Sequence, residues 1–215
     1  NMSTMLAATE VRPHEPGGAS KTPRRRWLLF TGAGFFLGLS QYTYTAVRFF
    51  PILICAMVFS ALVLSPPLVT RRWRALLLMA VVAFVVFAPL GVYFLQHPSD
   101  FYGRAEQISI FAPEFSGGDP WGRLWQSVKE TALMFTEWGD PNYRFNLSGE
   151  PVFGGLYGIL FVAGLGICGW YALRPVGPEG SPAHRLRRVA CVTLLLWLVI
   201  MLLPMTLSAE GLPSY

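Results

Sequence analysis

The sequence predicts an all-α protein, a polytopic bundle of about five transmembrane helices with a partly helical exoplasmic loop. Of its 215 residues, 53% are hydrophobic and only 13% are charged, whereas soluble domains have about 25% charged residues. Apolar stretches close to the ~20 residues that cross a bilayer recur along the chain. Basic and acidic residues gather in different connections, which is the asymmetry expected of an inserted protein.

The spanning helices are predicted in order along the chain from these apolar stretches. They are residues 27–46, 49–69, 75–95, 152–173 and 189–207. Residues 1–26 are expected to form a cytoplasmic tail or linker, with 2–9 as the stub of a preceding helix. Residues 208–215 are expected to start a truncated exoplasmic loop. Because neither end resembles a natural terminus, we expect an internal piece of a longer protein.

The basic residues predict the orientation of the bundle. They form three clusters, which are Lys21, Arg24, Arg25 and Arg26; Arg71, Arg72 and Arg74; and Arg174, Arg185, Arg187 and Arg188. Alternating spans place all three on one side, which the positive-inside rule makes cytoplasmic. The connection 174–188 is then a cytoplasmic loop, and the acidic segment 96–151 is exoplasmic. The net charge of +5 is thereby explained without a nucleic-acid partner, and the predicted location is the plasma (inner) membrane.

The exoplasmic loop is expected to contain a helix that begins after Asp119, a plausible N-cap, with Pro120 at its first position. Gly139 is expected to end it. The apolar positions recur at helical spacing and are Leu124, Val128, Thr131, Ala132, Phe135 and Trp138. With Trp121 and Trp125, this pattern predicts a helix lying on the outer membrane surface. A soluble helix packed on another exoplasmic domain is the alternative.

Small residues inside the spans predict close helix packing. Gly34 and Gly38 form a small-xxx-small pair. Gly164, Gly166 and Gly169 match a dinucleotide fingerprint, but they lie within an apolar span without the strand–turn–helix context that such a site requires. We therefore expect both sets to be faces against which a neighbouring helix packs.

Recognisable soluble-enzyme motifs are missing from the sequence, which has no Ser-His-Asp set, P-loop or HExxH. The three cysteines, Cys55, Cys168 and Cys191, fall in apolar stretches and are expected to be small buried residues. The three histidines are dispersed, so no metal site or cofactor is predicted.

Polar residues gather where the spans meet the exoplasmic side. In "QYTYTAVRFFP", Arg48 follows Tyr42 and Tyr44 and precedes the helix-breaking Pro51. Ionisable residues near a membrane are functional candidates by default. One interpretation is that Arg48 extends to the outer headgroups. The other is that its planar guanidinium binds a lipid phosphate through charge-assisted hydrogen bonds.

The sequence resembles polytopic GT-C glycosyltransferases in four stretches. In chain order they are "GLSQYTYTAVRFFP", "YFLQHPSDFYGRAEQISIF", "GDPNYRFNLSGEPVF" and "LPMTLSAEG". The nearest group is the bacterial family related to protein O-mannosyltransferases and the lipid A aminoarabinose transferase. The resemblance implies transfer of a sugar from a polyprenyl-phosphate carrier to an acceptor lipid, glycan or protein on the exoplasmic face. It places the catalytic base on an earlier exoplasmic loop, upstream of this chain, so the fragment alone is expected to be inactive.

The resemblance also implies roles for particular residues. Arg48, Arg104 and Tyr44 are expected at the carrier phosphate. Asp140, Asn142, Arg144 and Asn146 match the family's loop and are expected either to contact the acceptor or sugar or to form a network that stabilises the loop. His97, Asp100 and Glu210 are assigned to the same side by their position at the outer ends of the spans. Phe145 stands where the family's loop has a histidine, which argues against proton transfer at that position.

Two other functions are compatible with the topology. A transporter or flippase fragment would have broken helices with ionisable groups near the bilayer midplane, whereas the span centres here are nearly free of charge. A non-catalytic scaffold of surface-polysaccharide assembly would share the topology without requiring Arg48 and Arg104 to converge. Convergence of the two arginines with the loop 140–146 in one outer cavity would favour the enzyme.

Overall fold

The computed structural model describes residues 23–139, 147–175 and 181–209, except for the side chains of 104–108. Every regular element in these ranges is a helix, which confirms the all-α prediction. The elements are α1 (Pro23–Ser40), the 3₁₀ helix η1 (Thr45–Phe49), α2 (Phe50–Leu64), α3 (Pro66–Thr70), α4 (Trp73–Gln96), α5 (Pro98–Ile108), α6 (Pro113–Ser116), α7 (Pro120–Leu133), α8 (Gly155–Leu173) and α9 (Pro182–Thr206).

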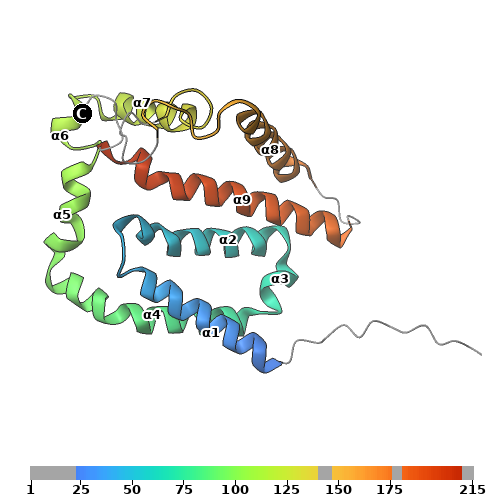
Figure 1. Cartoon of the computed structure of the whole chain (residues 1–215). Coiled ribbons are helices and arrows are strands. Elements are labelled where there is room, and N and C mark those ends of the chain that lie inside the picture. Colours follow the sequence, from blue (N-terminus) through green and yellow to red (C-terminus); the bar gives the residue numbers. More distant parts are fainter. Residues whose placement is uncertain (1–22, 140–146, 176–180, 210–215) are drawn as a thin grey trace, which may run out of the picture.

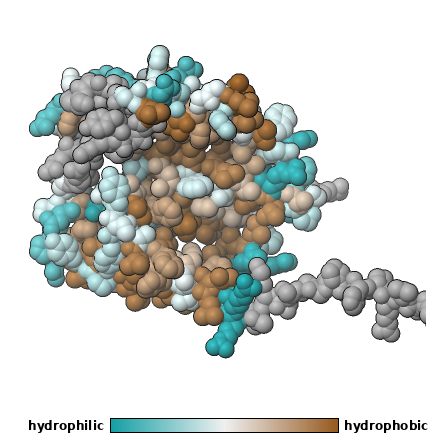
Figure 2. All heavy atoms as spheres, in the orientation of Figure 1, coloured by the Kyte–Doolittle hydropathy of each residue, from teal (hydrophilic) through white to brown (hydrophobic). Residues whose placement is uncertain are grey.

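Four helical segments of the described chain are long and apolar enough to cross a membrane. They are Thr45–Leu64, Trp73–Gln96, Gly155–Leu173 and Pro182–Thr206. Their outward side chains are apolar, as Phe84 on α4 illustrates, with 70% of its surface exposed. Figure 2 shows this apolar surface over much of the visible face. Such an exterior is stable only against lipid or further protein, so the chain is a membrane protein of a few spans.

The helix predicted over 27–46 has other bounds in the structure. Helix α1 ends at Ser40, where the amides of Gln41, Tyr42 and Thr43 turn back to the carbonyls of residues 38–40. Three arginines, Arg24–Arg26, occupy its first turn, so the apolar part is short. Helix α1 therefore does not qualify as a span by length and composition. The next span begins earlier than expected, because η1 runs directly into α2.

Two other predicted helix boundaries differ from the structure because of prolines and a helix cap. The second span ends at Leu64 rather than at residue 69, because Pro66 and Pro67 cannot continue the hydrogen-bond ladder of α2. Helix α9 begins at Pro182 rather than at residue 189, because the Ser181 hydroxyl accepts a hydrogen bond from the amide of His184. The predicted loop 174–188 is therefore partly helical.

Helix α1 packs along α4, and glycines permit the contact. A Cβ on Gly38 would lie 2.5 Å from the carbonyl oxygen of Ala83, and one on Gly34 would clash with the carbonyl of Met79. The predicted small-residue face is confirmed there. The same prediction for Gly164, Gly166 and Gly169 is wrong within the described chain, since no atom lies within 4 Å of a Cβ at any of them.

The bundle continues with α2 packed on α9, and α9 packed on α8. Figure 1 shows the start of α1, helix α3, the end of α8 and the start of α9 at one end of the molecule, where the arginines of the basic clusters lie. The start of α2, the α4–α5 junction and the end of α9 lie at the other end, which we call the loop end (Figure 1). The sequence predicted this separation.

The segment 98–133 forms three helices, α5 to α7, where the sequence predicted one. Its anchor is Ile110, which is fully buried against Ala209, with Phe115 and Leu124 packed around them. The Ile110 amide donates to the Leu207 carbonyl at 3.2 Å, and Ser127 Oγ donates to the Thr206 carbonyl at 2.8 Å. These contacts hold α6 and α7 on the end of α9.

Helix α7 begins as predicted but ends early. The Asp119 carboxylate accepts from the Gly122 amide at 2.9 Å, which confirms the N-cap. The helix ends at Leu133 instead of near Gly139. The carbonyls of Met134 and Phe135 accept hydrogen bonds from Val152 and Phe153 as the chain approaches α8. Tertiary hydrogen bonds replaced the last predicted helical turn.

Candidate functional site

The loop end brings together part of the predicted site. Arg48 on η1 contacts the α4–α5 junction, which carries His97 and Asp100. Tyr44 precedes η1 and is 69% exposed, and its hydroxyl makes no recorded hydrogen bond within the described chain. The side chain of Arg104 falls outside the described residues. So do Asp140, Asn142, Arg144, Asn146 and Glu210, whose predicted roles stay predictions.

The half-buried Arg48 guanidinium packs against two aromatic rings that also contact each other, with centroids 5.2 Å apart. Its Nη1 donates to the carbonyl of Phe101 at 2.7 Å. Its central carbon lies 4.9 Å from the centroid of the Phe94 ring and 4.6 Å from that of Phe101. Cation–π attraction is worth about 0.5–2 kcal/mol, depending on desolvation. We call Arg48, Phe94 and Phe101 the arginine clamp, and it joins η1 to the α4–α5 junction.

The chain folds this way because helix breakers stand on both sides of the clamp. Pro51, in the first turn of α2, follows η1, and Pro98 begins α5 directly after His97. The preceding turn is tied down by Gln41 Nε2, which donates to the Val47 carbonyl at 3.3 Å. Tyr42 Oη donates to the Val86 carbonyl of α4 at 2.9 Å, close to the kink-prone Pro89.

A polar cluster borders the clamp on α4 and α5. Tyr93 Oη donates to Asp100 Oδ2 at 2.5 Å. The His97 ring stacks on Tyr93 with centroids 4.5 Å apart, and its Nδ1 lies 3.2 Å from the Tyr93 carbonyl oxygen. His97 and Asp100 are exposed, so a ligand can reach both. Asp100 also stands in the first turn of α5, where a carboxylate favours the helix dipole.

Sequence reasoning missed the aromatic partners of the site. Phe94, Phe101 and Tyr93 were not singled out, although Tyr93 lies four residues before His97, a spacing that places both on one helix face. The contact of Phe94 and Phe101 with Arg48 depends on where η1 meets α4 and α5. No local sequence pattern predicts the contact between η1 and the α4–α5 junction.

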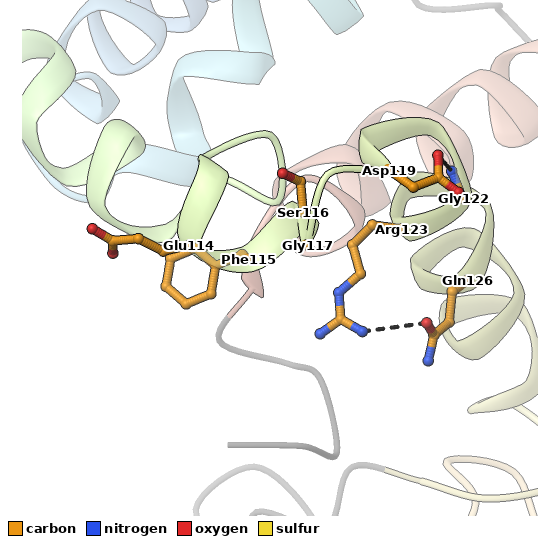
Figure 3. Close-up of a pocket in the computed structure, with 8 residues that line it drawn as sticks. All are labelled: Glu114, Phe115, Ser116, Gly117, Asp119, Gly122, Arg123 and Gln126. Carbon is orange, nitrogen blue, oxygen red and sulfur yellow. Dashed lines mark hydrogen bonds between the residues drawn. The ribbon is translucent and has the colours of Figure 1, made fainter.

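Away from the clamp, a hollow of about 440 Å³ lies between α6 and α7. Its lining comprises Glu114, Phe115, Ser116, Gly117, Asp119, Gly122, Arg123 and Gln126. Figure 3 shows Arg123 and Gln126 projecting from α7 to the same side, with Nη1 of Arg123 donating to Gln126 Oε1 at 3.2 Å. Glu114 points away from Arg123 (Figure 3). The hollow is a shallow polar surface rather than an enclosed pocket for a reaction.

The described part of the chain contains no cluster of side chains that could bind a metal ion. No group of three or more histidine, cysteine, aspartate or glutamate side chains could hold an ion among those residues. The site is therefore characterised by a cation, a carboxylate and an imidazole placed beside aromatic rings.

The fold and this site define an all-α membrane protein with ionisable groups at the end opposite its basic clusters. No protein-family model matches the chain, no curated protein matches it, and no solved structure matches it. The resemblance to GT-C glycosyltransferases therefore depends on the four short motifs alone, and the function below is a proposal.

Proposed function

We propose that the chain is part of an integral-membrane glycosyltransferase that transfers a sugar from a polyprenyl-phosphate carrier to an acceptor on the exoplasmic face. The observation that carries the proposal is the contact of Arg48 with the α4–α5 junction, which also carries His97 and Asp100. Such an enzyme needs a cation for the carrier phosphate and polar groups for the sugar at the same membrane boundary.

Arg48 suits a phosphate because the clamp orients it without using all its donors. A guanidinium has five N–H groups in a rigid plane. Within the described chain, one hydrogen bond from Arg48 is recorded, to the Phe101 carbonyl. The two aromatic rings pack against each other, with centroids 5.2 Å apart, and so lie on one side of the guanidinium carbon. We propose that the donors away from the rings bind two phosphate oxygens.

His97 and Asp100 are proposed to contact the sugar or the acceptor. Both are exposed, next to the clamp, and oriented by Tyr93. The Tyr93 hydroxyl donates to one carboxylate oxygen of Asp100 and fixes its direction. Assignment of a catalytic base is not part of this proposal. Arg104 is proposed as a second phosphate ligand because it follows Asp100 by one turn of α5.

The absence of charge from the span centres favours an interfacial enzyme over a transporter. Helices α2, α4 and α8 contain no ionisable side chain of Asp, Glu, Lys or Arg except Arg74 at the start of α4. Ion-coupled transporters place such groups near the midplane. The apolar exterior and the open glycine face of α8 leave room for an isoprenoid tail.

The test is binding of a short-chain polyprenyl monophosphate to the complete purified protein in detergent. Loss of a charge-assisted hydrogen-bond pair, about 1.5–3 kcal/mol, predicts that Arg48→Ala weakens binding about tenfold or more. Arg48→Lys should restore only part of it, because an ammonium cannot bind two oxygens in a plane. Arg24→Ala, at the opposite end of the bundle, is the matched control.

Two outcomes would contradict the proposal. One is unchanged binding by a folded Arg48→Ala variant. The other is equal affinity for the corresponding polyprenol, which has no phosphate. Either result would leave Arg48 with a structural role only and would favour the scaffold interpretation. Sugar transfer from the loaded carrier by the same variants then tests the reaction itself.

A further inference from the structure

Helix α7 presents three different faces, and only two of them have a clear partner. The first face consists of Leu124, Ser127 and Thr131, which recur at three- and four-residue spacing. Ser127 and Thr131 are 3% and 5% exposed, and Leu124 packs against the Ile110–Ala209 pair. This face is attached to α9, because Ser127 Oγ donates to the Thr206 carbonyl.

The second face is polar and consists of Arg123, Gln126 and Glu130. Arg123 and Gln126 line the hollow beside α6 (Figure 3). Gln126 Nε2 donates to Glu130 Oε1 at 2.9 Å. These side chains pair with one another at three- and four-residue spacing along the helix.

The third face is apolar and unpartnered, and we call it the aromatic face. It consists of Trp121, Trp125, Val128 and Ala132, which are all exposed in the described chain. Trp121 and Trp125 are 74% and 70% exposed. The Phe111 ring extends the same surface, with its centroid 6.4 Å from that of Trp121. At 100° per residue, this face is centred about 90° around the helix from the buried face.

The position of α7 determines what covers the aromatic face. Thr206 is the last residue of α9, a 25-residue helix apolar enough to cross a membrane. The bilayer boundary therefore passes close to Thr206, and Ser127 holds α7 at that level. The apolar exterior of the spans continues to this boundary. Tryptophan is enriched at membrane–water interfaces, where its ring meets lipid and its N–H meets water.

We propose that α7 is an interfacial anchor whose aromatic face lies in the headgroup–acyl boundary of the bilayer. The polar face, on the opposite side of the helix, is then directed to water, and the buried face is attached to α9. This three-way division has the amphipathic pattern of helices that lie in the membrane plane. The anchor fixes the height of the loop-end site above the bilayer, and it does not depend on the proposed reaction.

The test uses nitroxide labels on the full chain in phospholipid vesicles, with Cys55, Cys168 and Cys191 replaced by alanine. Val128→Cys places a label on the aromatic face while both tryptophans remain, and Gln126→Cys is the matched site on the polar face. Collision with oxygen, which concentrates in lipid, is compared with collision with a water-soluble nickel chelate. We expect the oxygen-to-nickel ratio to be several-fold higher at residue 128 than at 126.

Equal ratios at the two positions would overturn the proposal, because both faces would then be in water. A label at 128 shielded from oxygen and nickel alike would also overturn it, because the aromatic face would then be covered by protein. Binding of polyprenyl phosphate by the same labelled proteins is measured separately and depends on Arg48 rather than on residues 126 and 128, so failure of the anchor is distinguishable from failure of the proposed function.

Discussion

At the scale of single residues, the clamp changes the interpretation of Arg48. A basic side chain at a span end is often explained by its extension into the headgroups. Here the guanidinium turns inward, donates to a backbone carbonyl and packs beside two phenylalanine rings. It joins segments that are 53 residues apart in the sequence. A structural role is thus established by contacts, and the phosphate role is proposed in addition to it.

The clamp predicts a measurable loss of stability. Arg48→Ala removes one hydrogen bond from a charged donor and two cation–π contacts. We expect the free energy of unfolding to fall by about 2 kcal/mol, measured by thermal or denaturant unfolding in detergent. Arg24→Ala removes an exposed arginine at the other end and should change it by less than about 0.5 kcal/mol. Equal effects of the two substitutions would show that the clamp contributes nothing.

At the scale of elements, packing is local and depends on small residues and end contacts. Few side chains in the described spans are buried; Leu53 on α2 and Cys191 on α9 are examples. Van der Waals contact, rather than water exclusion, drives helix association in lipid. The α1–α4 pair therefore depends on the close approach at Gly34 and Gly38.

The glycines of α1 provide a matched pair of substitutions. Gly38→Ala would put a Cβ 2.5 Å from the Ala83 carbonyl and 2.7 Å from the Val86 Cβ, which must move apart. Gly32→Ala meets no atom within 4 Å. The added methyl group gains helix propensity at both positions, by up to ~1 kcal/mol. We expect a lower melting temperature for Gly38→Ala and an equal or higher one for Gly32→Ala; the reverse order would exclude this packing.

A cysteine pair tests the packing of α8 on α9. Cys168 and Cys191 are on α8 and α9, which pack on each other. The sequence predicted three buried cysteines, whereas Cys191 is buried, Cys168 is half-buried and Cys55 is exposed. Treatment with copper phenanthroline and oxygen should oxidise Cys168 and Cys191 to a disulfide. Oxygen takes up the two electrons and two protons that the thiols release. After denaturation, both residues should resist maleimide, while Cys55 should react. In Cys191→Ala, Cys168 should become reactive; reactive Cys168 in the oxidised wild type would contradict the packing.

At the scale of the whole molecule, charge is separated along the bundle. The arginine clusters gather at one end and the ionisable site residues at the other (Figure 1). Positive charge is retained on the cytoplasmic side during insertion. This separation is the physical reason for our proposal that the site is on the exoplasmic side.

The orientation is tested by labelling from outside intact cells. Two single-cysteine variants are compared, Thr70→Cys in the last position of α3 and Tyr102→Cys on α5. These positions lie at opposite ends of the bundle. Both positions are exposed, and the native cysteines are replaced by alanine. A membrane-impermeant maleimide should react with Tyr102→Cys in intact cells and with Thr70→Cys only after lysis. Labelling of residue 70 from outside would place the site in the cytoplasm and contradict the proposed function.

Sequence patterns predicted elements best where composition alone controls them. The span over 75–95 agrees with α4 to within two residues at each end, and the span ending at 173 agrees with the end of α8. Boundaries set by single residues were misjudged, although Pro66 and the Ser181–Pro182 cap are visible in the sequence. The early end of α7 has no local signal, because the carbonyls involved are taken by Val152 and Phe153.

The sequence by itself determined the helical class, the apolar spans and the end of the bundle at which the charged and polar residues lie. These features depend on hydropathy and charge, which each stretch of chain carries independently of its neighbours. Only the tertiary structure decided that Arg48 contacts Phe94 and Phe101, that Ser127 attaches α7 to α9, and that Gly38 rather than Gly164 touches a helix. Those contacts join segments distant in the chain, and in a membrane they depend on shape complementarity between helix surfaces, which no single stretch contains.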